Sequence, residues 1–355
     1  MVKGVRNAWP IAFLVLVTPC VEFLTGSTSF AAVVTTVPGA FTFFVLTWPS
    51  YAFPVLLIRE AIVAWNKWVA SLLALGIAYG ALNEGLLAKT YFVVTPTSPH
   101  LGGGAGVGHW LGVNWPWITE ITLFHMIVSI SVPVMLSFLI FPQTRQIRFL
   151  SERTIRLFIA LMLVEVLGIL TIQSLFSPVV RALLPLMLIP TGILLLGVYL
   201  ARRLPLPDPE RVLHGWFSKP FPLILASLGF FAVTFLPVLA FFPLPFLPDW
   251  ILGMLFYRLP GAALIATLYP LVFAYLAIRF FTRYTLTDTQ LLALLTGALL
   301  IPLTTAIAVH DIPQGDWAAA GVYIASIVVA ARRIRARSSI PAPTAPPAVP
   351  PPAVA

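Results

Sequence analysis

Long apolar runs separated by short polar segments cover most of the chain. Each run is about 20 residues long, the length that an α-helix needs to cross the hydrocarbon core of a bilayer. Continuous apolar runs without alternation indicate helices, because a spanning helix satisfies its own backbone hydrogen bonds. The sequence therefore predicts an all-α, polytopic integral membrane helix bundle of about ten spans, at residues 8–27, 39–64, 68–90, 115–141, 155–176, 179–201, 221–243, 259–280, 288–309 and 316–331.

The distribution of basic residues agrees with ten spans. Lysine and arginine residues beside spanning helices collect on the cytoplasmic side of a membrane. With ten spans, only Lys89, Arg181 and Arg258 of the 21 basic residues fall on the outer side, so the other 18 share one side. We therefore predict a multi-pass protein of the cell membrane whose N and C termini are both cytoplasmic.

The chain divides into three parts. Residues 1–150 form a first helical half with spans one to four, an intramembrane polar cluster and a glycine-rich outer loop at 91–114. Residues 151–337 form a second helical part with spans five to ten, which we interpret mostly as scaffold. Residues 338–355 are proline-rich and predict a disordered cytoplasmic tail. The glycine-rich loop offers no strand, so a phosphate-cradling loop is not predicted.

Composition narrows the classes of function. The chain is 59% hydrophobic and only 9% charged. Its formal net charge of +9 comes from basic residues scattered beside apolar runs, which favours membrane anchoring and no nucleic-acid partner. A single cysteine, Cys20, excludes an internal disulfide and a multi-cysteine metal site. The first apolar run lacks a cleavage pattern of small residues, so we expect a retained first helix rather than a signal peptide.

Ionisable side chains inside the apolar runs indicate where function lies. Placing a charged side chain near the bilayer centre costs a few kcal/mol of free energy on insertion scales, so each such residue is expected to have a partner or a functional role. The five that we place at membrane depth lie in the first five spans and are Glu22, Glu84, Glu120, His125 and Glu165. The later helices, residues 178–329, carry none at that depth. We therefore expect the chemistry in the first half of the chain.

Glu84 lies on a stripe of small residues. Gly76, Gly80, Glu84 and Ala88 recur every four residues and share one helix face. Small residues on such a face let a neighbouring helix approach closely. Glu84 is therefore expected to point at protein, with Asn83 beside it, rather than at lipid. The plain alternative is a hydrogen-bonded acid that only holds helices together.

His125 occupies the fourth span. Ser129 lies four residues later on the same helix face, and Pro133 frees a backbone carbonyl and favours a kink. Consecutive antiparallel helices bring His125 and Glu165 to nearly the same depth, so we predict that they form a pair. Such a pair can relay protons or act in general acid–base catalysis. The alternative is a neutral histidine hydrogen-bonded to another helix.

These expectations assign roles to individual residues. We predict that Glu84, His125 and Glu165 are the catalytic residues. The side chains expected to bind substrate are those of Glu22, Asn83, Glu120, Asn114 and Ser129.

Other charged positions are interpreted more plainly. Arg59 and Glu60 are adjacent charges at a helix end, which we interpret as anchors that reach water. His310, Asp311 and Asp316 form only a weak cation signal, because a proline-containing turn divides them. No metal site is predicted, and the sequence leaves the cofactor unknown.

Three short motifs in order carry a resemblance. The segments LLIRE, YGALNEG and GVNWPW, within about residues 20–145, resemble a poorly characterised group of prokaryotic multi-span membrane proteins. A fainter similarity is to the CPBP group of intramembrane proteases, which use a Glu-Glu-xxx-Arg motif and two histidine motifs. Asn83 stands at the first glutamate position, Glu84 at the second and Ala88 at the arginine position. The resemblance implies water activation by Glu84 and His125.

Three classes of function therefore stay open. The first is a membrane-embedded hydrolase that acts on a lipid-linked or membrane substrate, with the 91–114 loop as a lid. The second is a proton- or cation-coupled transporter that uses the same outward-facing acids. The third is a structural or assembly subunit whose acids only form hydrogen bonds. The expected partners are the lipid bilayer and a lipid or membrane-embedded substrate.

Overall fold

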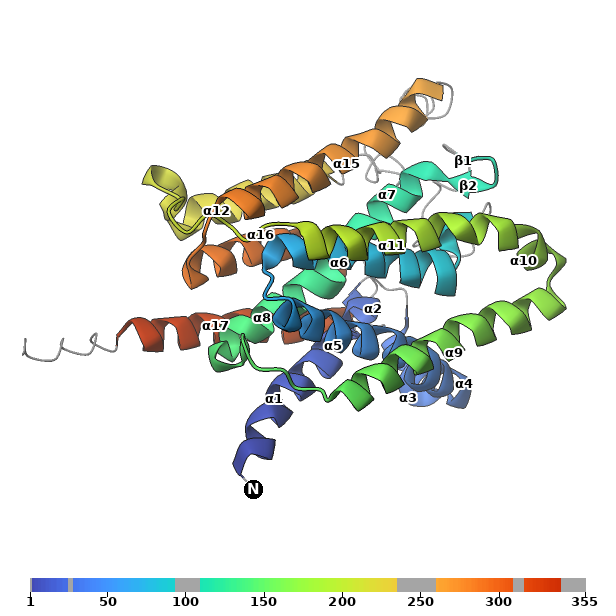
Figure 1. Ribbon diagram of the computed structural model, residues 1–355, viewed down its shortest axis with the longest axis horizontal. Helices are drawn as coiled ribbons and strands as arrows, with labels where there is room; N and C mark the ends of the chain where they lie inside the picture. Colours follow the sequence, from blue (N-terminus) through green and yellow to red (C-terminus); the bar gives the residue numbers. More distant parts are fainter. Residues whose placement is uncertain (1, 25–27, 93–108, 235–259, 309–315, 340–355) are drawn as a thin grey trace, which may run out of the picture.

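The computed structural model of the chain describes residues 2–24, 28–92, 109–234, 260–308 and 316–339 (Figure 1). Almost all of its regular structure is helical, which confirms the all-α class. Six helices are long and apolar enough to cross a membrane: Val37–Ala64, Val69–Leu87, Trp115–Ile140, Glu152–Phe176, Pro178–Arg203 and Trp317–Ser338. Shorter apolar helices occupy Ala8–Leu24, Pro220–Thr234 and Asp288–Thr304.

Helices cover all ten predicted ranges as far as these are described. The first half contains α1 Val2–Val17, α2 Cys20–Leu24, α3 Phe30–Thr35, α4 Val37–Phe41, η1 Thr42–Thr47, α5 Trp48–Ala64, α6 Val69–Gly80, η2 Ala81–Leu87, η3 Thr90–Phe92, α7 Trp115–Phe124, η6 His125–Ser131, α8 Val132–Ile140 and η7 Pro142–Thr144. The second part contains α9 Glu152–Phe176, α10 Pro178–Leu183, η8 Leu184–Met187, α11 Leu188–Arg203, η9 Gly215–Ser218, α12 Pro220–Thr234, α15 Pro260–Arg283, α16 Asp288–Ala308 and α17 Asp316–Ser338. The number of ten crossings stays a prediction.

A small hairpin interrupts the helices. Strands β1 (His109–Trp110) and β2 (Val113–Asn114) pair antiparallel just before α7. The expectation that the 91–114 loop offers no strand is therefore wrong at its end, because Leu111 and Gly112 both take positive φ and form a tight turn. The strands follow the glycine run in sequence rather than precede it, so the order that a phosphate-binding loop requires is still not met.

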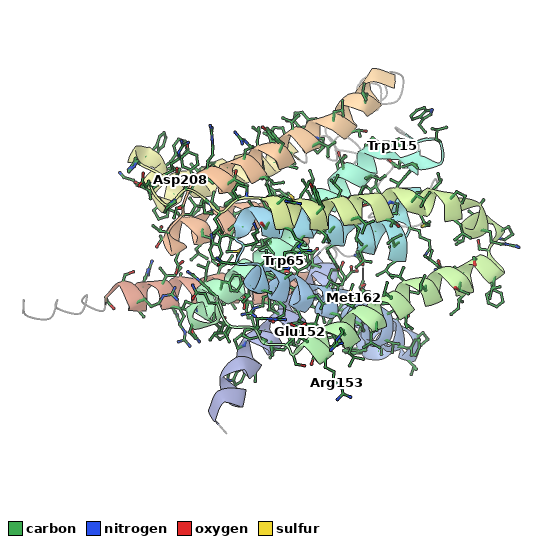
Figure 2. All side chains as sticks on the ribbon, in the orientation of Figure 1. Trp65, Trp115, Glu152, Arg153, Met162 and Asp208 are labelled. Atoms are coloured by element: carbon green, nitrogen blue, oxygen red, sulfur yellow. The ribbon has the colours of Figure 1, made fainter. Side chains whose placement is uncertain are left out.

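The helices that carry the predicted site lie in the middle of the bundle. In Val69–Leu87 and in Trp115–Ile140, 89% of the most apolar 18-residue stretch is buried inside the protein. In Glu152–Phe176 the corresponding share is 6%. Figure 1 shows α6 between α5 and α11, with α9 at the edge of the bundle. Arg153, at the start of α9, projects away from the other helices (Figure 2). The apolar surface of α9 is therefore suited to lipid contact.

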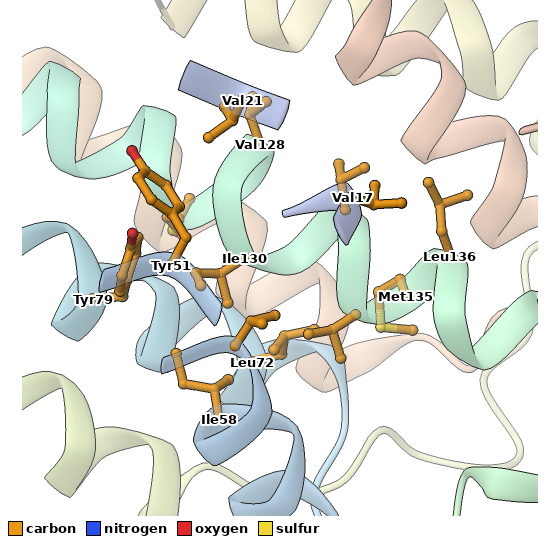
Figure 3. Packing of buried hydrophobic residues seen from close by; sticks show 14 of the residues in the cluster. Val17, Val21, Tyr51, Ile58, Leu72, Tyr79, Val128, Ile130, Met135 and Leu136 are labelled. Atoms are coloured by element: carbon orange, nitrogen blue, oxygen red, sulfur yellow. The ribbon is translucent and has the colours of Figure 1, made fainter. Parts of the chain in front are cut away.

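Two glycines set the distance between α6 and the helix formed by α7 and η6. A Cβ atom on Gly76 would lie 2.7 Å from Met126 Cα, and one on Gly80 would lie 2.9 Å from Thr122 Cα. Real Cβ atoms do not approach backbone so closely, so both positions require glycine. The predicted close approach along the stripe of small residues is confirmed. Valine, leucine and tyrosine side chains fill the surrounding core (Figure 3).

The interpretation of Arg59 and Glu60 as anchors that reach water is wrong. Their exposed fractions are 0% and 2%, and Arg59 Nη1 donates to Glu60 Oε1 at 2.5 Å. The segment after α8 folds over them. Arg59 also donates to the Thr144 carbonyl and stacks on Phe149, while the Phe149 N–H donates to Glu60 at 3.0 Å. A buried ion pair with these extra hydrogen bonds needs no access to water.

The second part of the chain packs tightly against itself and against the first half. The Ser227 hydroxyl on α12 donates to the Leu294 carbonyl on α16 at 2.6 Å. Asp288, at the start of α16, accepts hydrogen bonds from Arg145 at 2.7 Å and from Arg337 on α17 at 3.1 Å. These contacts join the end of the first half to the last helices of the chain.

We expect Gly76→Ala to destabilise the protein by about 1–3 kcal/mol, because its methyl group would overlap the Met126 backbone. Gly168→Ala on α9 is the matched control, since a Cβ there meets nothing within 4 Å. The control should be neutral or slightly stabilising, by up to about 1 kcal/mol. Unfolding of both variants by titration with sodium dodecyl sulfate in mixed micelles measures the difference. Equal stabilities would contradict the close approach.

Candidate functional site

The structure brings Glu84 and His125 into direct contact. Glu84 Oε1 lies 2.8 Å from His125 Nε2. The other ring nitrogen, Nδ1, lies 2.7 Å from the Ser129 hydroxyl, four residues later on the same helix. A carboxylate and a hydroxyl thus hold the imidazole from both sides, which fixes the orientation of the ring.

Both residues lie in π-helical segments, Glu84 in η2 and His125 in η6. Such segments are rare within α-helices and are frequent at functional sites. Their wider turns are hydrogen-bonded: the Ala88 N–H donates to the Asn83 carbonyl at 2.8 Å, and the Ser131 hydroxyl donates to the Met126 carbonyl at 2.6 Å. Pro133, two residues past η6, has no N–H for the carbonyl four residues before it, which favours a change of helical register there.

The second oxygen of Glu84 is held by the segment that follows η2. The Thr90 hydroxyl donates to Glu84 Oε2 at 2.5 Å, and the Trp117 indole N–H donates to that hydroxyl at 3.0 Å. Asn114 caps the helix that carries Trp117, because its side chain accepts from the Trp117 backbone N–H at 3.1 Å. Asn114, predicted to bind substrate, therefore positions α7 in this structure.

Hydrogen bonds continue from His125 towards the first helices. The Asn83 side-chain amide lies 3.5 Å from His125 Nε2 and donates to the Tyr51 hydroxyl at 3.2 Å. Tyr51 in turn donates to Glu22 Oε1, and Thr28 donates to Glu22 Oε2 at 3.1 Å. We call the connected side chains the polar network: Glu22, Thr28, Tyr51, Asn83, Glu84, Thr90, Trp117, His125 and Ser129.

The polar network is enclosed by protein. The side chains of His125 and Glu84 are 3% and 12% exposed, so the carboxylate is the more accessible partner. Tyr79 lies beside Tyr51, a member of the network (Figure 3). The rings of Tyr79 and His125 meet edge to face, with their centroids 5.5 Å apart. Low exposure strengthens electrostatic interactions within the network, because little water screens them.

Two predicted residues lie outside the polar network. Glu165 is half-buried on α9. The predicted pairing of His125 with Glu165 is wrong, because both ring nitrogens of His125 are held by Glu84 and Ser129. Glu120 is 2% exposed on α7, and neither of its carboxylate oxygens has a hydrogen-bond partner in the part of the chain that the structure describes.

The network also contains residues that were not predicted from the sequence. Tyr51, Thr90, Thr28 and Trp117 link the acids and the histidine. Hydroxyl and indole groups are uncharged, and they are common in apolar helices because burying them there costs little free energy. The sequence therefore does not distinguish these four residues as site residues.

Metal binding is not indicated within the described ranges, where no group of three or more histidine, cysteine or acidic side chains could hold an ion. His310 and Asp311 lie outside the described residues, and Asp316 begins α17. The hydrogen-bonding capacity of His125 is already used by protein groups.

Comparison with known proteins gives no family: no family model, no curated protein and no solved structure matches the chain. The resemblance to the prokaryotic multi-span group and to CPBP-type proteases stays a prediction.

Tyr51→Phe should destabilise the protein by about 1–3 kcal/mol, because it removes a donor to Glu22 and the acceptor for Asn83. The matched control is Tyr323→Phe, whose buried hydroxyl makes only a 3.4 Å contact with the Val17 carbonyl. The control should lose less than about 1 kcal/mol. The same unfolding titration compares the two, and equal losses would argue against a connected network.

Proposed function

We propose that this protein is a membrane-embedded hydrolase that acts on a lipid-linked or membrane substrate, with Glu84 and His125 as its acid–base pair. The observation that supports this proposal is the 2.8 Å contact between Glu84 Oε1 and His125 Nε2 in a nearly water-free interior. A carboxylate and an imidazole at this distance can take a proton from water and return it to a leaving group.

Each neighbour of the pair has a role in the proposed chemistry. Ser129 orients the ring so that Nε2 faces Glu84, and Thr90 fixes the second carboxylate oxygen. The accessible edge of the Glu84 side chain, 12% exposed, is where water and substrate would approach. Ser129 is 0% exposed, which is unfavourable for a nucleophile. We therefore assign the attack to water rather than to a serine hydroxyl.

A proton-coupled transporter is the second candidate. The observation that favours it is the chain of hydrogen bonds from Glu84 and His125 through Asn83 and Tyr51 to Glu22. Hydrogen-bonded titratable groups at membrane depth form proton relays in carriers. Against it, the whole network comes from the first half of the chain, whereas carriers build their sites between two halves.

We also propose that the protein lies in the cell membrane with both termini cytoplasmic and the polar network near the outer side. The supporting observation is the collection of basic residues on alternate connections between helices. With Cys20 replaced by serine, Ser177→Cys should react with an impermeant maleimide in intact cells. Ser151→Cys, at the other end of α9, should react only after permeabilisation. Labelling of both in intact cells would overturn this orientation.

Glu84→Gln tests the proposed activity, because glutamine keeps the shape but loses the base. In proteoliposomes made from a bacterial lipid extract, the wild type should release lipid products, measured by mass spectrometry. Glu84→Gln should reduce that rate about 100- to 10,000-fold. Glu210→Gln, at an exposed site, is the control and should keep the wild-type rate.

Parallel recording of proton flux separates the candidates. Loss of proton flux in Glu84→Gln without any lipid product from the wild type would favour the transporter. If the wild type shows neither activity, the polar network has only a structural role, as in the third class of function, a structural or assembly subunit.

A further inference from the structure

Lys89 is a buried lysine directly beside the polar network. It follows η2, two residues beyond the apolar helix Val69–Leu87, and is 6% exposed. Its φ is +61°, a left-handed conformation that side chains other than glycine seldom adopt. A buried, charged residue in this conformation is unfavourable on two counts, so a specific role is expected.

The charge of Lys89 has no counter-charge in the part of the chain that the structure describes. Its ammonium group donates to the Leu87 carbonyl at 2.9 Å, and none of the ion pairs within the described residues includes it. Buried charges in proteins are normally paired, because desolvation without a partner costs several kcal/mol. A carbonyl uses only one of three N–H donors. The remaining donors are available for an anion from outside the chain.

The position of Lys89 places that anion next to the site. Thr90, the next residue, donates to Glu84 and accepts from Trp117. In the orientation proposed above, Lys89 is one of three basic residues that lie on the outer side against the general distribution. Trp110 and Trp115, at the hairpin and the start of α7, have the character of membrane-interface residues, and lipid phosphates lie at that level.

We propose that the Lys89 ammonium group binds a phosphate oxyanion beside the Glu84–His125 pair. The proposal deepens the proposed function by giving the substrate class as a phosphate-bearing lipid. The role of the Lys89–phosphate contact in catalysis rests on the proposed function. The binding itself does not. The phosphate would satisfy the two open donors of Lys89 while the rest of the lipid reaches the accessible edge of Glu84.

A capping role explains only part of these observations. The contact with the Leu87 carbonyl closes the C-terminal end of η2, and lysine is favourable at that end of a helix. Glycine or asparagine would take the left-handed conformation more easily and would bury no charge. Capping therefore gives no reason for an uncompensated ammonium group at this position.

Burial lowers the pKa of Lys89 to about 8, and no charged group contributes to that shift. The elements packed against η2 and η3 carry these titratable groups: Tyr79, Glu84, Tyr91, Glu120, Glu152, Arg153, Arg156, Glu165, Tyr199, Arg202 and Arg203. A bound phosphate stabilises the ammonium form and so raises this pKa. Phosphate binding is therefore strongest below about pH 8 and weakens as the pH rises through that value.

The test uses the wild-type chain, so it does not depend on a variant that folds. Acetic anhydride reacts with the neutral form of an amine, and the acetylation rate of each lysine can be followed by peptide mass spectrometry. Lys67 is the matched internal control, because its ammonium group also donates to a backbone carbonyl, that of Leu204, at 2.7 Å. Rates are compared against pH in three samples in phosphate-free buffer: delipidated protein in dodecyl maltoside micelles, the same micelles with phosphatidylglycerol, and the same micelles with millimolar inorganic phosphate.

In dodecyl maltoside micelles alone, the acetylation rate of Lys89 should rise with a midpoint near pH 8. Phosphatidylglycerol should slow the acetylation of Lys89 about fivefold at that pH, which corresponds to a midpoint about one unit higher, and should leave the rate of Lys67 much less changed. Slowing by inorganic phosphate alone would keep the phosphate site and overturn the lipid as its source. Equal slowing of both lysines, or none of Lys89, would overturn the proposal, whatever the lipid products of Glu84→Gln show.

Discussion

The close contact between α6 and the helix of α7 and η6 is the interaction on which the site depends. Gly76 and Gly80 have no side chain, so the backbones at Met126 and Thr122 come within reach. That approach brings the carboxylate of η2 to the imidazole of η6. In a hydrocarbon environment no water compensates a misplaced acid, so the remaining hydrogen-bonding groups must also come from protein. Tyr51, Thr90 and Asn83 supply them.

The helical class and the positions of the long apolar helices were predictable because the length of an apolar run is a direct requirement of the bilayer. The sixth predicted range, 179–201, differs by only one or two residues from the helix Pro178–Arg203. Glu84, His125 and Glu22 were visible as candidates since ionised groups are rare in apolar runs. Hydroxyl groups such as those of Tyr51 and Thr90 carry no such penalty, so their part in the network required coordinates.

Two predictions, the pairing of His125 with Glu165 and the exposure of Arg59 and Glu60 to water, were wrong for different physical reasons. The pairing of His125 with Glu165 was inferred from depth along the helices, but depth does not determine which face a side chain occupies. The π-helical turn at His125 changes that face, and Pro133 marks a disturbed helix there without determining which way the side chains turn. Arg59 and Glu60 were expected to reach water because they end a helix. The chain at Thr144 and Phe149 folds back over them instead, a long-range contact that local pattern does not reveal.

A π-helical turn differs from an α-helical one by a single additional residue. If the same residues of η2 were wound as a regular α-helix, everything beyond them would rotate by about 100° about the helix axis. Thr90 and Lys89 would then leave the side of the helix on which they now lie. The positions of the side chains around Glu84 therefore depend on how many residues η2 holds in its wide turn, as well as on which residues these are. A chain with one residue fewer in this segment would keep the same positions only with a regular turn in place of the wide one.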